Sequence, residues 1–125
     1  MNAQTLALRA YGNTASTART PRSIEFELIA RITHRIRAAA MKGRKNYPQL
    51  VEALNENQRL WTTLAVDIAD PNNELPADLR ARLFYLAEFV QHHTSLVLRK
   101  KARITPLLEV NAAVLRGLSQ SGAAS

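Results

Sequence analysis

The fold of this 125-residue chain is decided by residues 58–93, QRLWTTLAVDIADPNNELPADLRARLFYLAEFVQHH. The row of side chains that enters this stretch recurs in steps of four and three, at Leu50, Leu54, Asn57, Trp61, Leu64 and Ile68. After a turn rich in Pro and Asn, a second row follows at Leu79, Leu83, Leu86, Val90, His93 and Val97. Such spacing keeps side chains on one face of an α-helix. Because the connection is short, the two helices are predicted to be antiparallel neighbours.

The rest of the chain extends this pattern into an all-α, single-domain bundle of four to five helices. Helices are expected near residues 21–42, 47–69, 76–101 and 105–118, with Trp61 buried between the second and the third of them. Pro at the first helical positions and Gly43 after a last turn supply start and stop signals. We expect residues 1–20 to hold a short helix and a flexible linker, and residues 119–125 to form a disordered tail.

The helix near residues 76–101 is more apolar than one packing seam needs. A second stripe, formed by Tyr85, Phe89 and Leu96, widens its apolar arc to roughly 160° at about 100° per residue. His92 lies at the edge of this stripe. A helix with so wide an arc is expected to be central in the bundle or to offer part of its surface to another protein.

Three polar residues, Asn57, His93 and Asn111, occupy positions where the periodicity predicts core side chains. Burying an amide or imidazole without partners costs on the order of 1–3 kcal/mol, so we expect these groups to bond one another, the backbone or water. We interpret them as a structural polar core that fixes the helix register. A catalytic role for His93 beside Asp67 or Glu88 would need a nucleophile or a substrate pocket, and the sequence supplies neither.

No motif predicts an enzyme, a cofactor or a metal. His92 and His93 are adjacent, so on a helix they point about 100° apart, whereas helical zinc pairs are spaced i, i+4. The chain has no Cys, and its four Gly are too scattered for a phosphate-binding loop. No stretch approaches the roughly 18–20 apolar residues that cross a bilayer, and the first residues lack a secretory signal. We therefore expect a non-catalytic cytoplasmic protein.

Positive charge is concentrated in the first third of the chain. Residues 1–45 carry nine Lys/Arg and two Glu, a net charge of +7, whereas residues 46–125 carry eight Lys/Arg and eight Asp/Glu. The candidate electrostatic patch consists of Arg31, Arg35, Lys42, Arg44 and Lys45. Such a patch attracts an acidic partner or nucleic acid, or it is a solvated face that keeps the protein soluble.

Several short motifs, in order along residues 9–118, carry a family resemblance. They are Ala10-Tyr11-Gly12, Arg19-Thr20-Pro21-Arg22, Asn57-Gln58-Arg59-Leu60-Trp61, the cluster of Phe84, Tyr85 and Phe89 with His92 and His93, and Asn111-Ala112-Ala113-Val114-Leu115-Arg116-Gly117-Leu118. Each motif is weak alone, but the combination resembles the alphaproteobacterial flagellar biosynthesis family FlaF.

This resemblance implies a cytoplasmic factor needed for flagellin production and filament assembly. Members of the family are associated with flagellin as a secretion chaperone or adaptor, and they act alongside the translational regulator FlbT. Export components are further candidate partners. The stripe of Tyr85, Phe89, His92 and Leu96 is then the candidate groove for an amphipathic helix of flagellin.

A nucleic-acid-binding regulator of flagellin messenger RNA is the alternative. The basic patch would supply its phosphate contacts, which would make binding strongly dependent on salt. Against this, only Phe26 and Tyr47 flank the patch as aromatic side chains able to stack on bases. No nucleic-acid-binding motif is present either.

Overall fold

The computed structural model describes residues 21–124, with the side chains of residues 26–43 and 45–117. Within this range the chain forms four α-helices and one 3-10 helix and has no strand. In chain order these elements are α2 (Pro21–Met41), η1 (Gly43–Asn46), α3 (Tyr47–Ala69), α4 (Ala77–Leu98) and α5 (Thr105–Ala124). The predicted all-α fold class is confirmed. The short helix and linker expected in residues 1–20 lie outside the described residues.

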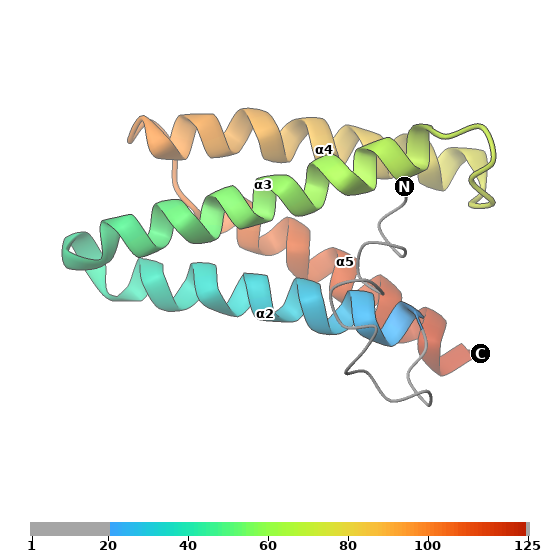
Figure 1. The fold of residues 1–125 in the computed structure, drawn as a ribbon, viewed down its shortest axis with the longest axis horizontal. Coiled ribbons are helices and arrows are strands. Elements are labelled where there is room, and N and C mark those ends of the chain that lie inside the picture. The colour runs from blue at the N-terminus through green and yellow to red at the C-terminus, as the bar shows by residue number, and fades with distance from the viewer. Residues whose placement is uncertain (1–20, 125) are drawn as a thin grey trace.

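The central helix of the bundle is α3 (Figure 1). It packs along α4 on one side and along α2 on the other, and α2 in turn packs along α5. Like α5, α4 is an outer helix of the bundle: it packs chiefly on α3, meets α5 over a short stretch and makes no close backbone approach to α2. The helix with the wide apolar arc is therefore not central, and the bundle leaves part of that arc uncovered.

The turn between α3 and α4 is held by its own Asp and Asn side chains. The carboxylate of Asp70 accepts a hydrogen bond from the backbone N–H of Asn72, at 2.9 Å. The Asn73 side-chain oxygen accepts one from the backbone N–H of Leu75, also at 2.9 Å. These local bonds are the reason that Asp and Asn favour turns. The two helices run antiparallel, as the short connection predicted (Figure 1).

Residues with a positive φ angle end both α2 and α4. After α2 the residue is Gly43, with φ of 76°, and glycine adopts this left-handed conformation without steric cost. After α4 it is Lys100, with φ of 62°. Here the backbone N–H of Lys100 bonds to the Val97 carbonyl and that of Lys101 to the Leu96 carbonyl, each at 2.9 Å. This is the Schellman arrangement, and it stops α4 at Leu98 instead of near residue 101.

The last helix is longer than expected. Residues 119–124, which we expected to belong to a disordered tail, are part of α5, which continues to Ala124. Gly117 does not stop the helix, because an interior Gly costs only about 1 kcal/mol relative to Ala and no Pro follows it.

The hydrophobic core is small and gathers around α3. It consists of Ile32, Ile36, Ala53, Leu54, Trp61, Ala87, Val90 and Leu107. Trp61 is 1% exposed, as its position in the row predicted. The residues that α4 buries are small ones, Ala87, Val90 and Thr94. Larger members of its predicted row, such as Leu79 and Leu83, stay at least partly exposed, because the small residues let α4 approach α3 closely along a narrow strip.

Candidate partner-binding surfaces

A hydrogen-bonded polar cluster lies inside the core and links α2, α3 and α5. Asn111 is its hub, and its side-chain oxygen accepts a hydrogen bond from the indole Nε1 of Trp61 at 2.9 Å. The Asn111 amide nitrogen donates to the side-chain oxygens of Asn57 at 2.9 Å and Thr33 at 3.1 Å. The Thr33 hydroxyl donates to the Ile29 carbonyl at 2.7 Å. Because the bonds join three helices, the cluster fixes how these helices align.

Two predicted members of the polar core, Asn57 and Asn111, therefore lie together and are fully buried. The buried Nδ2 atom of Asn57 nevertheless has no hydrogen-bond partner. An unsatisfied buried amide nitrogen lowers stability, so this cluster is better explained by helix alignment than by a gain in stability.

The third predicted member, His93, lies elsewhere. It is partly exposed, and its Nε2 atom is 2.6 Å from the backbone carbonyl oxygen of Arg103. Since a carbonyl only accepts, Nε2 carries the proton in this bond. The imidazole also stacks on Phe89, with 5.2 Å between ring centroids. His93 thus connects the loop after α4 to the helix. The prediction that His93 lies in the core was wrong, because α4 buries a narrower face than expected.

The candidate partner stripe lies on one flank of α4, which we call the outer flank. Tyr85 is 69% exposed and His92 is exposed, while Phe89 and Leu96 are half-buried. None of the four belongs to the core cluster or packs against it. The outer flank is therefore apolar surface that the described bundle does not use for its own core.

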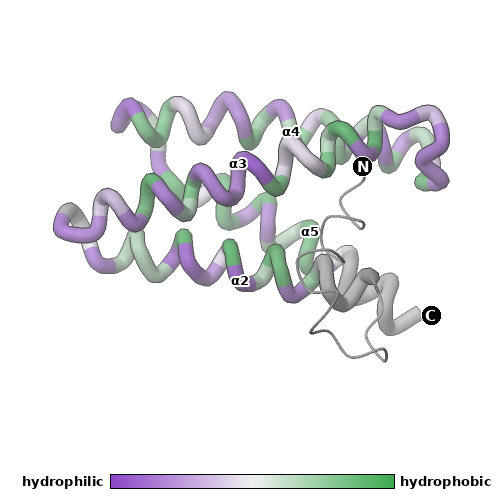
Figure 2. Tube along the Cα trace, viewed as in Figure 1, coloured by the Kyte–Doolittle hydropathy of each residue, from purple (hydrophilic) through white to green (hydrophobic). Residues whose placement is uncertain are grey.

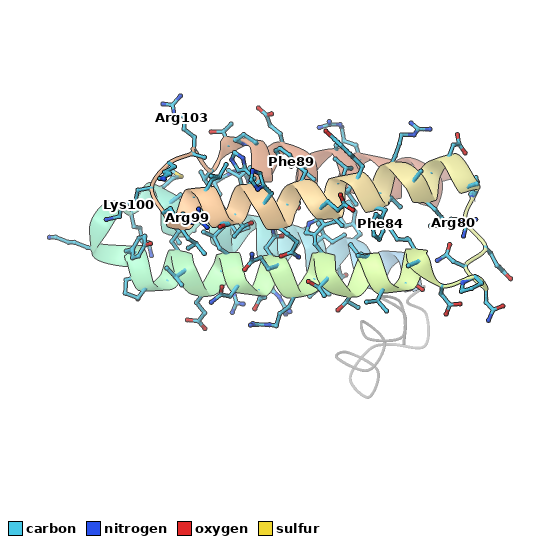
Figure 3. The ribbon with its side chains drawn as sticks, turned by 90° about the horizontal axis from the view of Figure 1, so that it is seen from above. Arg80, Phe84, Phe89, Arg99, Lys100 and Arg103 are labelled. Carbon is cyan, nitrogen blue, oxygen red and sulfur yellow. The ribbon has the colours of Figure 1, made fainter. Side chains whose placement is uncertain are left out.

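A second apolar surface, between α3 and α4, was not anticipated from the sequence. Phe84 is 41% exposed and Val66 is 58% exposed, and both border a hollow of about 310 Å³. Figure 3 shows Phe84 on the edge of α4 that faces α3, opposite the edge that carries Phe89. The signal in the sequence was a set of small residues on the facing helices, Ala65, Ala69 and Ala87. Small residues leave a depression between larger neighbours.

Uncovered apolar surface on both edges of one helix is typical of proteins that bind other proteins. A comparison with protein families identifies the family: the model of the flagellar protein FlaF matches residues 7–118. This chain belongs to the FlaF family. Comparisons with curated proteins and with solved structures gave no match. The resemblance carried by the sequence motifs is confirmed, and family membership gives the chain a role in the flagellum.

In this FlaF-family chain the expected basic patch is divided. Arg35 is engaged on α3, since its Nη1 atom lies 2.9 and 2.7 Å from the two carboxylate oxygens of Glu56. Arg31 is exposed on the same stretch of α2. Lys42 and Lys45 are exposed at the end of the bundle, around η1, and the side chain of Arg44 lies outside the described ones.

The part of the chain that the structure describes contains no group of three His, Cys, Asp or Glu residues able to hold a metal ion. None of its helices is long and apolar enough to cross a membrane. A further hollow of about 490 Å³, along α3, is lined by amides, hydroxyls and one guanidinium group: Asn55, Gln58, Arg59, Thr62, Thr63 and Gln91.

Proposed function

We propose that this FlaF-family protein binds flagellin in the cytoplasm before export, as a chaperone or adaptor without enzymatic activity. The observation that carries the proposal is the outer flank of α4, where Tyr85, Phe89 and Leu96 form apolar surface outside the core. The flagellar role of the family supports flagellin as the partner.

The geometry of the outer flank suits a helical ligand. Tyr85 and Phe89 are spaced i, i+4, and Phe89 and Leu96 are spaced i, i+7, so they form a row along α4. An amphipathic helix laid along such a row buries its own apolar face, as helix-in-groove ligands do. Covering an apolar helix before export also prevents its aggregation.

The test is to measure the affinity of purified flagellin for the protein and for its Phe89→Ala variant by titration calorimetry. Loss of an aromatic anchor should weaken binding by more than about 1–2 kcal/mol. Phe26→Ala is the matched control, since Phe26 lies on α2 and is 37% exposed. It should leave the affinity unchanged. Cells with Phe89→Ala should swim poorly while containing folded protein.

If Phe89→Ala loses thermal stability but its folded fraction binds flagellin with unchanged affinity, the outer flank is not the binding surface. Phe84→Ala tests the other edge of α4 in the same assay. If Phe84→Ala weakens binding and Phe89→Ala does not, flagellin occupies the hollow between α3 and α4 instead.

Direct binding of flagellin messenger RNA is the second candidate function, and the exposed Lys42 and Lys45 favour it. A complex that uses several phosphate contacts should weaken by orders of magnitude between low and physiological salt. Apolar contact with flagellin should change only modestly over that range. Tight, salt-sensitive binding to the messenger RNA without detectable binding to flagellin would reverse the ranking. FlbT is a further proposed partner, which co-purification from cells lacking flagellin would reveal.

A further inference from the structure

Two basic segments that are far apart in the sequence meet at one end of the bundle. Residues 38–51 contain three Lys/Arg, residues 89–108 contain four, and neither stretch contains Asp or Glu. The first stretch surrounds η1 and the second surrounds the C-terminus of α4, which lie at the same end of the molecule (Figure 1). We call it the basic end, and it is mainly hydrophilic (Figure 2). Its exposed cations are Lys42, Lys45, Arg99, Lys100, Lys101 and Arg103.

A contact between Tyr47 and Lys100 holds the two segments together. The Tyr47 hydroxyl donates a hydrogen bond to the Leu98 carbonyl at 3.3 Å. The Lys100 ammonium lies 5.5 Å from the centroid of the Tyr47 ring, within the range of a cation–π interaction. Lys100 adopts its positive φ at a position that glycine usually occupies, and a lysine there is disfavoured. The fold thus keeps a strained residue whose side chain joins the α4–α5 loop to the start of α3.

Charge at helix ends accounts for only part of this surface. Cations near the C-termini of α2 and α4 interact favourably with the helix dipoles, but that effect falls off beyond the last turn. Arg103 lies after α4, and Lys45 lies after α2. Unlike Arg35 with Glu56, none of the exposed cations of the basic end forms an ion pair with a carboxylate of the described residues.

We infer that the basic end binds carboxylates of flagellin, next to the helix that flagellin places on the outer flank of α4. This inference rests on the proposed function. The two surfaces are continuous, because His93 stacks on Phe89 of the flank and bonds the carbonyl of Arg103 in the basic loop. Figure 3 shows Arg99, Lys100 and Arg103 at the end of the helix that carries Phe89. A ligand with an apolar helix and an acidic flank would contact both surfaces.

A protein ligand fits this end better than RNA does. RNA-binding surfaces combine cations with aromatic faces on which bases stack. Here one face of the Tyr47 ring is covered by Lys100, and one face of the Phe89 ring is covered by His93. Carboxylates need no such platform, and cations held in a fixed arrangement attract them over long range.

The experiment compares two double variants that remove the same charge. Lys101→Gln with Arg103→Gln neutralises the basic end, and Arg59→Gln with Arg116→Gln neutralises two exposed arginines elsewhere. Affinity for purified flagellin is measured at about 50 mM and about 500 mM salt, where screening of exposed charges differs strongly. The first variant should bind about tenfold more weakly at low salt, with the difference largely lost at high salt, and the second should bind like the unaltered protein. Melting temperatures confirm that both remain folded.

The outcomes separate this inference from the proposed function. If Phe89→Ala weakens binding while both double variants bind equally, the basic end takes no part and only the inference fails. If flagellin does not bind the unaltered protein at all, the proposed function fails first. If the first double variant keeps its flagellin affinity but loses affinity for a single-stranded RNA of about 20 nucleotides, the basic end is a phosphate site and the inference is overturned.

Discussion

The polar cluster around Asn111 and the outer flank of α4 reverse the usual distribution of side chains. Inside the bundle, two asparagines and a threonine are almost completely buried. On the outer flank Tyr85 is 69% exposed, and at the hollow between α3 and α4 Phe84 and Val66 are 41% and 58% exposed. A helical bundle optimised for its own stability would exchange these positions, since buried apolar area stabilises and a buried amide without a partner destabilises.

We infer that the two regions have different roles. Hydrogen bonds in the interior specify one alignment of α2, α3 and α5, because a shifted helix would leave further amides unpaired. Apolar side chains on α4 contribute little to that alignment and remain available to a partner. Changes in the interior should therefore alter the free energy of unfolding, and changes on α4 should alter binding. Four substitutions, in decreasing order of their expected cost in stability, test this division.

Trp61→Ala should have the largest effect. It removes a large core side chain and leaves the Asn111 oxygen without its donor, so we expect a loss of about 3–5 kcal/mol in the free energy of unfolding. Urea denaturation followed by circular dichroism measures it. Trp61→Phe is the control, which keeps an aromatic ring in the core but removes the indole N–H together with part of the ring volume. A loss below about 1 kcal/mol for Trp61→Ala would show that the interior does not depend on this residue.

Asn111→Leu should come next and should cost more than Asn57→Leu. Replacing Asn111 leaves the Trp61 indole N–H and the Asn57 oxygen without hydrogen-bond partners. Each buried group left unpaired lowers the free energy of unfolding by about 1–3 kcal/mol. Replacing Asn57 also removes an amide nitrogen that already lacks a partner, which offsets part of its loss. The two free energies of unfolding, measured side by side, decide whether Asn111 is the hub. Equal losses would contradict that assignment.

Helical periodicity explains which parts of these regions could be predicted from the sequence and which could not. The row through Leu54, Asn57 and Trp61 placed the buried face of α3 correctly, because α3 has neighbours on both sides and buries a wide face. The same reasoning misplaced His93 on α4, which packs chiefly on one helix. Periodicity reports which residues share a face, but the width of the buried strip depends on how many helices cover it.

The sites were less predictable than the fold, for reasons of three-dimensional proximity. The hydrogen bond between Asn57 and Asn111 could have been predicted from the sequence, since both residues occupy positions on predicted packing faces. The joining of Tyr47 to Lys100 was not, because it depends on where α4 ends and on the positive φ of a lysine. The hollow beside Phe84 likewise depends on how closely α3 and α4 approach each other. Small residues allow a close approach, but their presence in the sequence does not predict it.

Phe89→Ala should cost less stability than Leu86→Ala. Leu86 packs against the core cluster, whereas Phe89 does not. We expect about 2–3 kcal/mol for Leu86→Ala and about 1 kcal/mol for Phe89→Ala, in spite of the larger side chain that the second change removes. Thermal unfolding of the two variants in parallel provides the comparison. If Phe89→Ala is the more damaging, the outer flank belongs to the core and the division between interior and surface fails on α4.

Tyr85→Ser should have the smallest effect on stability. A side chain that is 69% exposed loses little burial when it is shortened, so the free energy of unfolding should stay within about 0.5 kcal/mol of its original value. Serine and tyrosine have similar helix propensities, so the small loss we expect comes only from the part of the ring that is buried. Tyr85→Ala is the control, because it removes the same ring and raises the helix propensity of the position, so it should be neutral or slightly stabilising. Both variants should bind flagellin more weakly, since Tyr85 lies in the row that we assign to the ligand. Unchanged stability together with unchanged affinity would show that the row is shorter than proposed and begins at Phe89, which would narrow the contact to the half of α4 nearest the basic end.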